Sequence, residues 1–251
     1  MQERVVGLIP VRIESSRLPG KALLPIDGLP AIIHTYKRAL LSKSLSDVIV
    51  CTDSKEIQST LIQNNVKVEM TESHINGSER IYEIARKYNY KNVLNIQGDE
   101  ILLQPEHIDK MVQSMLSGNK HEFFIGITDF QLSNEKNVFK AVTNKNDEMM
   151  YCSREDIPSP AITKKNKFKK VVFLVGYKNF SLNRFIEWGE CNLENEEPNE
   201  FLRILYHGEK IRTVKLQNAQ ISLDTQQDLE TIQTLIAVSY THLTLPTTPY
   251  V

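Results

Sequence analysis

The sequence predicts an α/β fold with a mostly parallel sheet flanked by helices and a small inserted lobe of mixed sheet. Two observations support it. Short apolar runs alternate with amphipathic segments through roughly the first half of the chain, which is typical of parallel sheets. From about residue 123 strand-like segments follow one another without such helices, so we expect an inserted lobe over residues 123–180.

Expected strands and helices alternate regularly through the first half of the chain. Apolar runs of strand length are each followed by a segment with apolar residues at helical spacing. We expect Ser78 to cap the third helix and Pro105 to lie near the start of the fourth. The expected strands are Val5–Ile9, Val48–Thr52, Val66–Met70 and Val93–Gln97, and the expected helices are Pro30–Leu41, Glu56–Asn64, Glu79–Tyr88 and Pro105–Leu116.

The second half begins with the lobe and returns to alternation. The lysine-rich segment Lys164–Lys170 is expected to be an exposed loop. The expected strands are Phe123–Phe130, Val138–Thr143, Met149–Cys152, Val171–Val175, Ile211–Val214 and Ala219–Leu223, and the expected helices are Ser181–Trp188, Asn199–His207 and Thr225–Ile236. Residues 1–237 are thus predicted to form one domain. Residues 238–251 are rich in threonine and contain two prolines, and their apolar residues follow neither the helix period nor the strand period. We interpret this stretch as a non-native or disordered tail.

Composition narrows the class of protein. The chain has 251 residues and a net charge of −1, which argues against a nucleic-acid or membrane-surface partner. No apolar run is long enough to span a membrane, and the N-terminus lacks a signal-peptide pattern. Cys51, Cys152 and Cys191 are odd in number and widely spaced, so we expect reduced thiols and a cytoplasmic enzyme.

The loop after the first strand is rich in groups that bind phosphate. Arg12 and Arg17 carry guanidinium forks, Lys21 carries a point charge, and Ser16 and Gly20 can line an anion-binding concavity. The loop is neither a Walker P-loop nor a dinucleotide-binding glycine loop. A solvated basic turn is the alternative. Because open α/β folds bind ligands at strand ends, phosphate binding is the favoured interpretation.

Two acidic segments follow later strands. Asp99 and Glu100 end the strand before the fourth helix, and Asp224 lies between an expected strand and the last helix. Asp224 alone is equally compatible with a helix N-cap. Two strand-end aspartates beside a phosphate loop favour a Mg²⁺ site, because Mg²⁺ takes one or two protein carboxylates together with substrate phosphates.

A polar turn delivers Arg80 into the first turn of the third helix. A cation there opposes the helix dipole, so the placement suggests an anionic or specifically bonded partner. A surface arginine paired with Glu79 or Glu83 is the alternative.

Six motifs in order resemble the 3-deoxy-manno-octulosonate (Kdo) cytidylyltransferases, also called CMP-Kdo synthetases. The resemblance runs from about Val5 to Ile236 and implies a Rossmann-like nucleotidyltransferase fold. The motifs are Arg12-x-x-Ser-Ser-Arg-Leu-Pro-Gly-Lys21, His74-x-x-Gly-Ser-Glu-Arg80, Asn95-Ile-Gln-Gly-Asp-Glu100, Asn137-Val-Phe-Lys140, Ser153-Arg154-x-x-Ile-Pro158 and Leu223-Asp-Thr-x-x-Asp-Leu229.

The resemblance implies a role for individual residues. The substrates would be CTP and a 3-deoxy-2-keto sugar acid, joined in lipopolysaccharide biosynthesis, and the cofactor Mg²⁺. The roles expected are catalysis by Arg12, Lys21 and Asp99, phosphate binding by Arg12, Ser16 and Lys21, base and ribose binding by Ser78, Arg80 and Gln97, metal binding by Asp99 and Asp224, and sugar binding by Arg154, Tyr177 and Glu200.

The chain departs from the family pattern mainly on the acceptor side. Val171 stands where the family usually has histidine, and Phe201 where it has glutamine; Ile101 replaces a usual proline. Loss of groups that hydrogen-bond a sugar hydroxyl alters discrimination, so the acceptor is expected to be Kdo or a related sugar acid. The alternatives are an acylneuraminate-type cytidylyltransferase and an inactive nucleotide-binding relative.

The resemblance also implies a homodimer. The apolar segment Val171–Val175, with Phe123–Ile125 and Ile157-Pro158, is expected to supply edge strands that a two-fold partner covers. The alternative is that these strands are buried against the main sheet within a monomer.

Overall fold

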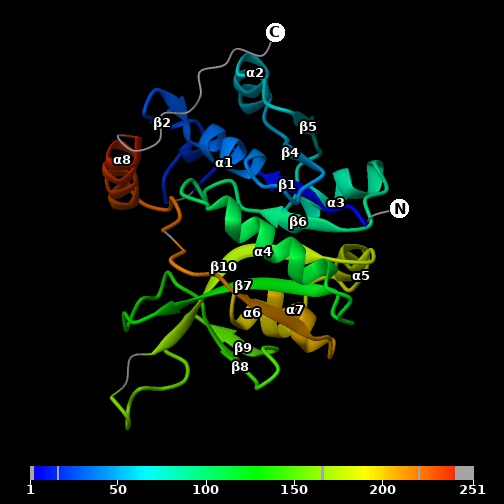
Figure 1. The fold of residues 1–251 in the computed structure, drawn as a ribbon, viewed down its shortest axis with the longest axis vertical. Helices are drawn as coiled ribbons and strands as arrows, with labels where there is room; N and C mark the ends of the chain where they lie inside the picture. The colour runs from blue at the N-terminus through cyan, green and yellow to red at the C-terminus, as the bar shows by residue number, and fades with distance from the viewer. Residues whose placement is uncertain (1–2, 16, 165–166, 220, 241–251) are drawn as a thin grey trace.

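A single large sheet forms the centre of the molecule. The computed structural model describes residues 3–15, 17–164, 167–219 and 221–240 (Figure 1). The order of the strands along the sheet is β11-β7-β10-β6-β1-β4-β5, with β8 and β9 attached beside β10. The strands are β1 (Val6–Pro10), β4 (Asp47–Thr52), β5 (Val68–Met70), β6 (Val93–Ile96), β7 (Phe123–Phe130), β8 (Lys140–Thr143), β9 (Met149–Ser153), β10 (Phe168–Tyr177) and β11 (Ile211–Lys215), and β2 (Pro25–Ile26) pairs separately with β3 (Leu29–Pro30).

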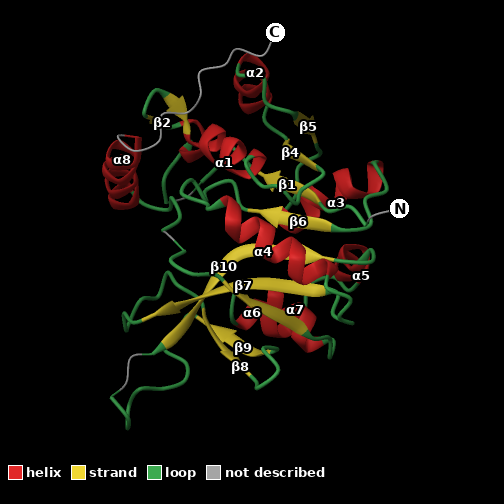
Figure 2. Cartoon of the chain, viewed as in Figure 1, coloured by secondary structure: helices red, strands yellow, loops and turns green. Residues whose placement is uncertain are grey.

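Most neighbouring strands are parallel. β1 pairs in parallel with β4 and β6, β4 with β5, and β11 with β7, whereas β10 runs antiparallel between β6 and β7. The expected α/β fold with a mostly parallel, helix-flanked sheet is confirmed (Figure 2). The helical segments are η1 (Lys21–Leu23), α1 (Ala31–Leu40), α2 (Lys55–Gln63), α3 (Gly77–Lys87), α4 (Pro105–Leu116), α5 (Ser181–Glu187), α6 (Asn192–Glu196), α7 (Phe201–Tyr206) and α8 (Gln226–Tyr240).

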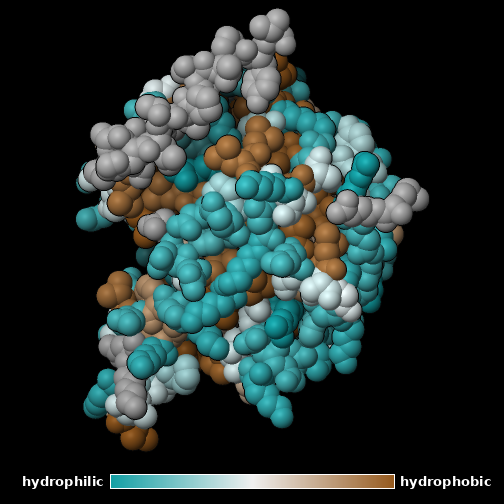
Figure 3. Space-filling view, in the orientation of Figure 1, coloured by the Kyte–Doolittle hydropathy of each residue, from teal (hydrophilic) through white to brown (hydrophobic). Residues whose placement is uncertain are grey.

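Alternation along the strands sends side chains to two cores. Ile9 packs with α1, α2 and α4 on one face of the sheet, while Leu8 packs with α3, α5 and α7 on the other. Each such aliphatic side chain stabilises the fold by about 1.5–3 kcal/mol on burial. The outward surfaces of the helices are polar, and the face in Figure 3 is accordingly mostly hydrophilic over α4. Among the described residues no helix is long and apolar enough to cross a membrane.

Helix α8 packs through its own small core. Leu229, Ile232 and Ile236 share one face of the helix and are buried against Leu18 and Ile26. This contact brings the start of α8 beside the loop that follows β1, although more than 200 residues separate them in sequence. The helix extends to Tyr240, so residues 238–240 of the expected tail are helical, and residues 241–251 lie outside the described residues.

Three local expectations are wrong. Lys164–Lys170 is not wholly a loop, because β10 begins at Phe168. Ser78 does not cap α3: the cap is Asn76, whose side chain accepts the Glu79 N–H at 2.9 Å. The described residues of 219–223 form no strand, and the Leu223 N–H instead donates to the Asp99 carbonyl, just beyond β6, at 2.9 Å.

The expected lobe shares its strands with the central sheet. β7 and β10 are interior strands of the sheet, so only the β8–β9 hairpin and its connecting loops extend away from it. β10 therefore offers no free edge to a partner, and Phe123 and Ile125 are fully buried within the protein. The edge-strand premise of the predicted dimer is wrong, while the dimer itself stays a prediction.

Candidate active site

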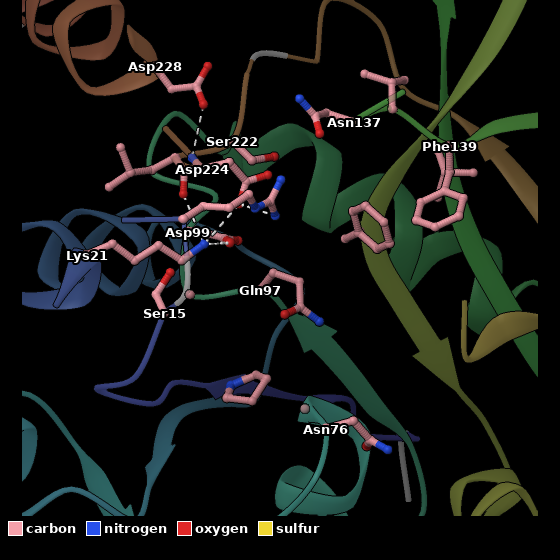
Figure 4. Close-up of a pocket in the computed structure, with 18 of the residues that line it drawn as sticks. Ser15, Lys21, Asn76, Gln97, Asp99, Asn137, Phe139, Ser222, Asp224 and Asp228 are labelled. Atoms are coloured by element: carbon pink, nitrogen blue, oxygen red, sulfur yellow. Dashed lines mark hydrogen bonds and ion pairs between the residues drawn. The ribbon is translucent and has the colours of Figure 1, made fainter. Parts of the chain in front are cut away.

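A cleft of about 710 Å³ opens at the carboxyl ends of β1 and β6. Its lining comes from the loop after β1, the start of α3, the end of β6, β10 and the segments before α7 and α8. Ligands of open α/β folds bind at this edge of the sheet. Figure 4 shows the side chains that reach the cleft, with Lys21 and Asp99 at one side, Gln97 in the middle and Phe139 at the other.

Two glycines allow the segments around the cleft to approach closely. A Cβ at Gly98 would lie 3.1 Å from the Pro10 carbonyl oxygen and 3.2 Å from Ile32. A Cβ at Gly77 would lie 3.1 Å from the Pro10 side chain. These distances are shorter than ordinary carbon contacts. Glycine at both positions therefore permits α3, β1 and β6 to converge on one site.

Lys21 joins the two predicted metal-binding carboxylates. Its Nζ donates to Asp99 Oδ2 at 2.5 Å, to Asp224 Oδ1 at 3.1 Å and to the Leu223 carbonyl at 3.0 Å. The two carboxylate oxygens are therefore no further apart than the sum of the first two distances. Burial lowers the pKa of Lys21, but Asp99 and Asp224 reverse this effect and the net shift is upward. The structure thus confirms the proximity of both aspartates, and Lys21 remains an ammonium.

Neighbouring groups hold this cluster in place. Arg17 donates to Asp224 Oδ1 at 2.9 Å. Asp228 Oδ2 accepts the N–H groups of Asp224 at 3.1 Å and Thr225 at 2.8 Å, while the Asp228 N–H donates to Thr225 Oγ1 at 3.2 Å. This reciprocal arrangement is a capping box, so Thr225 caps α8 and Asp224 is free to face the cleft. The N-cap alternative for Asp224 is therefore wrong.

Glu100 lies behind Asp99 and takes no part in the cleft lining. It is buried, and its Oε1 accepts a hydrogen bond from Ser222 Oγ at 2.7 Å. Burial and the nearby Asp99 charge raise the pKa of Glu100 to about 7. Among the described residues no group of three or more His, Cys, Asp or Glu side chains is arranged to hold a metal ion. Any Mg²⁺ here would thus rely on Asp99, Asp224 and substrate oxygens.

Four of the predicted nucleotide-binding residues line the cleft: Arg12, Lys21, Arg80 and Gln97. Arg12 is exposed on the loop after β1, and Gln97 lies at the end of β6. Arg80 is buried apart from its cleft-facing surface, and its guanidinium donates to Asp53 at 2.9 Å and Thr71 at 2.7 Å. The anionic partner anticipated for Arg80 is therefore Asp53, which orients the arginine. Ser16 lies outside the described residues.

Ser78 and Tyr177 lie behind the cleft instead of lining it. The fully buried Ser78 Oγ is 3.1 Å from the Tyr177 hydroxyl and donates to Glu200 Oε1 at 2.9 Å. Of these three residues only Glu200 lines the cleft. Burial raises the pKa of Tyr177, with Glu200 adding to the shift, so Tyr177 stays a neutral hydroxyl.

Aromatic side chains form the wall of the cleft on the predicted acceptor side. Phe173 packs against Phe139 and Phe201, with ring centroids 6.1 and 5.9 Å apart. The guanidinium of Arg154 lies 4.1 Å from the centre of the Phe139 ring. Val171 joins the same wall. We call Phe139, Val171, Phe173 and Phe201 the apolar wall.

The register of β10 explains how the wall forms. Leu174 pairs with Ile96, the last residue of β6, so the earlier residues of β10 run past the end of β6. Val171 and Phe173 therefore reach the cleft. Sequence periodicity identified the strand but carried no signal for this register, and Phe139 and Phe173 were missed as site residues for that reason.

Three comparisons with known proteins each find similarity to cytidylyltransferases. Residues 6–211 match the family described as Cytidylyltransferase. The 3-deoxy-manno-octulosonate cytidylyltransferase of Chlorobium limicola is 34% identical over 238 residues, covering 92% of this chain and 96% of the relative. The one of Bdellovibrio bacteriovorus is 34% identical over 245 residues, covering 93% and 98%. A solved structure of CMP:2-keto-3-deoxy-manno-octonic acid synthetase complexed with CTP is 31% identical, with a TM-score of 0.88 over 94% of this chain and 99% of that one.

Proposed function

The chain belongs to the 3-deoxy-manno-octulosonate cytidylyltransferase family, and on that basis we propose that it transfers CMP from CTP to Kdo or a closely related 3-deoxy-2-keto sugar acid. The product would enter lipopolysaccharide biosynthesis. The observation that carries the proposal is the single cleft in which Lys21, Asp99 and Asp224 meet at one side and Arg154 and Glu200 lie among its lining residues.

The reaction is an in-line displacement at phosphorus. An oxygen–phosphorus bond forms between the anomeric 2-hydroxyl of the sugar acid and the α-phosphate of CTP. The bond between the α-phosphate and the bridging oxygen breaks, the hydroxyl loses its proton, and pyrophosphate leaves. Such transfers depend on positioning and charge neutralisation more than on covalent chemistry. Lys21 and Arg12 would neutralise the charge that develops on the phosphate oxygens.

The donor set at Asp99 and Asp224 fits Mg²⁺. Both carboxylates converge on one cationic group, the Lys21 ammonium, and carboxylate oxygens are the ligands that Mg²⁺ prefers. When bound, the ion would lower the pKa of the attacking hydroxyl and polarise the α-phosphate. Asp228 and Arg17 orient Asp224 for either cation.

Base selection is assigned to Gln97 and Arg80. Gln97 carries an amide with both donors and an acceptor for a base edge, and Arg80, which lines the same cleft, is held by Asp53. A pocket matched to the 4-amino edge of cytosine leaves buried polar groups unpaired when UTP binds. We therefore expect CTP to be strongly preferred.

Pyrophosphate release from each of the four nucleoside triphosphates, with Kdo or sialic acid as acceptor, tests the proposal. We expect release with CTP and Kdo, and little with UTP or sialic acid. Gln97→Leu should lower the preference for CTP over UTP about tenfold or more, whereas Gln113→Leu, at an exposed position on α4, should leave it unchanged. Equal use of CTP and UTP by the unaltered protein would contradict the assignment.

The proposal extends to cellular context and assembly. We place the reaction in the cytoplasm, which is supported by three buried, unpaired cysteines suited to a reducing compartment. The homodimer rests on the family resemblance alone. Its contact surface would have to lie outside β10, because that strand is paired on both sides.

A further inference from the structure

Glu200 is a buried carboxyl group with only one of its oxygens satisfied. Oε1 accepts the Ser78 hydroxyl at 2.9 Å, and Ser78 Oγ is in turn 3.1 Å from the Tyr177 hydroxyl. Oε2 is enclosed and has no hydrogen-bond partner among the described residues. Since Glu200 lines the cleft, a bound molecule is the available partner for Oε2.

The charged groups around Glu200 already have other hydrogen-bond partners. Arg203, on the same helix, donates to both carboxylate oxygens of Glu194 on α6, at 2.8 and 2.6 Å. On α3, Glu79 accepts from the Asn76 side chain and Arg80 donates to Asp53. From β10, the neutral Tyr177 reaches Glu200 through Ser78. Within the described part of the chain, no cation is thus paired with a Glu200 carboxylate.

The apolar wall removes further polar support. Phe201 follows Glu200 directly, and it packs on Phe173. At Phe201 and Val171 the family pattern has glutamine and histidine, so two polar side chains are absent from this side of the cleft in the present chain. An ionised carboxyl group in such surroundings is strongly disfavoured.

The shift in acidity agrees with this geometry. Burial raises the pKa of Glu200, the Ser78 hydrogen bond and Arg203 lower it, and Glu194 and Glu79 raise it again, to about 7 from the ordinary 4.5. The neutral acid therefore persists to near neutral pH.

Resting on the proposed function, we propose that Glu200 meets the sugar acid as a neutral carboxylic acid whose Oε2 hydroxyl donates a hydrogen bond to an acceptor oxygen. Ser78 and Tyr177 act through Glu200 as positioning residues. The neutral form also avoids repulsion between Glu200 and an acceptor that is itself anionic. Glu200 thus determines acceptor affinity in a pH-dependent way and takes no part in binding CTP.

Acceptor kinetics across pH test the donor role. The KM for the sugar acid should rise about tenfold between about pH 6 and about pH 9, with its midpoint near pH 7, while the KM for CTP does not follow this profile. Glu200→Gln should abolish the rise, because an amide donates at every pH. Glu196→Gln, at an exposed site, should retain it. A flat acceptor profile in the active unaltered enzyme overturns the inference.

Substitutions of the two positioning residues, Ser78 and Tyr177, test their role separately. Ser78→Ala removes a hydrogen bond that favours the ionised form, so the midpoint of the acceptor profile should move to higher pH. Tyr177→Phe should raise the acceptor KM several-fold with little change in kcat, since Glu200 is held less firmly. A merely structural role for Ser78 would leave the midpoint unmoved and would contradict the assignment.

Thermal unfolding tests the protonation state of Glu200 without a measurement of enzyme activity. Between about pH 4.5 and about pH 7 the folded protein retains a Glu200 proton that the unfolded chain has released, so this contribution to stability is lost as pH rises. The melting temperature of Glu200→Gln relative to the unaltered protein should therefore increase across that range. A difference in melting temperature between the two proteins that stays constant with pH contradicts a neutral Glu200. A difference that grows with pH, in a protein that releases no pyrophosphate at any pH, contradicts the proposed function instead.

Discussion

Single residues in the cleft act through opposed charges held at short range. Lys21 is about one-fifth exposed and lies between two carboxylates, so its charge is stabilised despite burial. The same carboxylates would be left without a cation if the lysine moved toward a phosphate. A divalent ion would resolve that imbalance, since it replaces one positive charge by two. The cluster thus suits a site that alternates between an empty and a nucleotide-bound state.

Loss of either aspartate should abolish most of the activity. Asp99→Asn and Asp224→Asn keep the side-chain shape but remove the charge, so we expect turnover with Mg²⁺ to fall about a thousandfold in each. Asp129→Asn, at an exposed position, is the matched control. Circular dichroism should show that all three variants remain folded. Near-normal turnover in either site variant would remove that aspartate from the mechanism.

Lys21 is expected to act through the specific contacts of its ammonium group as well as through its charge. Lys21→Ala is expected to lower kcat/KM for CTP by about 10²–10³, since a preorganised charge on the phosphates is lost. Lys21→Arg should recover only part of this, because a planar fork does not reproduce the contacts of one ammonium with Asp99, Asp224 and the Leu223 carbonyl. Lys37→Ala, exposed on α1, should have no effect on CTP kinetics. Full recovery by arginine would argue for simple charge attraction.

At the scale of elements, helix termini position the chemistry. Asn76 caps α3 and so sets the place of Ser78 and Arg80, the second and fourth residues of the helix. Thr225 and Asp228 cap α8 reciprocally, and Asp228 also binds the Asp224 N–H. A cap that also holds a functional carboxylate couples helix stability to activity.

Thr225→Ala tests whether the cap of α8 affects activity as well as the stability of the helix. Removing the cap is expected to lower the free energy of unfolding by about 1 kcal/mol. Turnover should fall too, because the Asp224 backbone is less constrained. Thr231→Ala, on an exposed interior position of the same helix, should change both quantities little. Urea unfolding and steady-state kinetics measure the two effects, and equal losses in both variants would contradict a special role for the cap.

At the scale of the whole molecule, the order of strands creates the cleft. β1 and β6 are parallel neighbours, so the loops that carry Lys21 and Asp99 emerge at one edge. β10 is antiparallel to β6 and overruns it, which places the apolar wall opposite those loops. Helix α8 then closes the site by packing on the segment after β1.

The homodimer is tested by mass in solution. Light scattering should give about twice the chain mass of 28.8 kDa. A mass near that of one chain at micromolar concentration would contradict the dimer. Phe173→Glu would not test the interface, because Phe173 packs on Phe139 and Phe201 within one chain. We expect that change to destabilise the wall and to lower acceptor use instead.

Local sequence determined the α/β class, most strands and helices, and the basic loop after the first strand. The reason is physical: buried strands and amphipathic helices repeat at short periods, and polar loops after apolar strands meet at one sheet edge. The place of Lys21 and Asp99 at one sheet edge was predictable on those grounds, whereas the strand expected before Asp224 does not form among the described residues.

Tertiary structure alone decided which polar groups reach the cleft and which lie behind it. Ser78 and Tyr177 are directed to Glu200 because α3 and β10 pack against each other's side chains in the same core. The antiparallel place of β10, the register that brings Phe173 to the cleft and the hydrogen bond from Leu223 to Asp99 depend on contacts between segments far apart in the chain. Periodicity reports which face of an element is buried, whereas pairing partners and register follow from how the faces fit together.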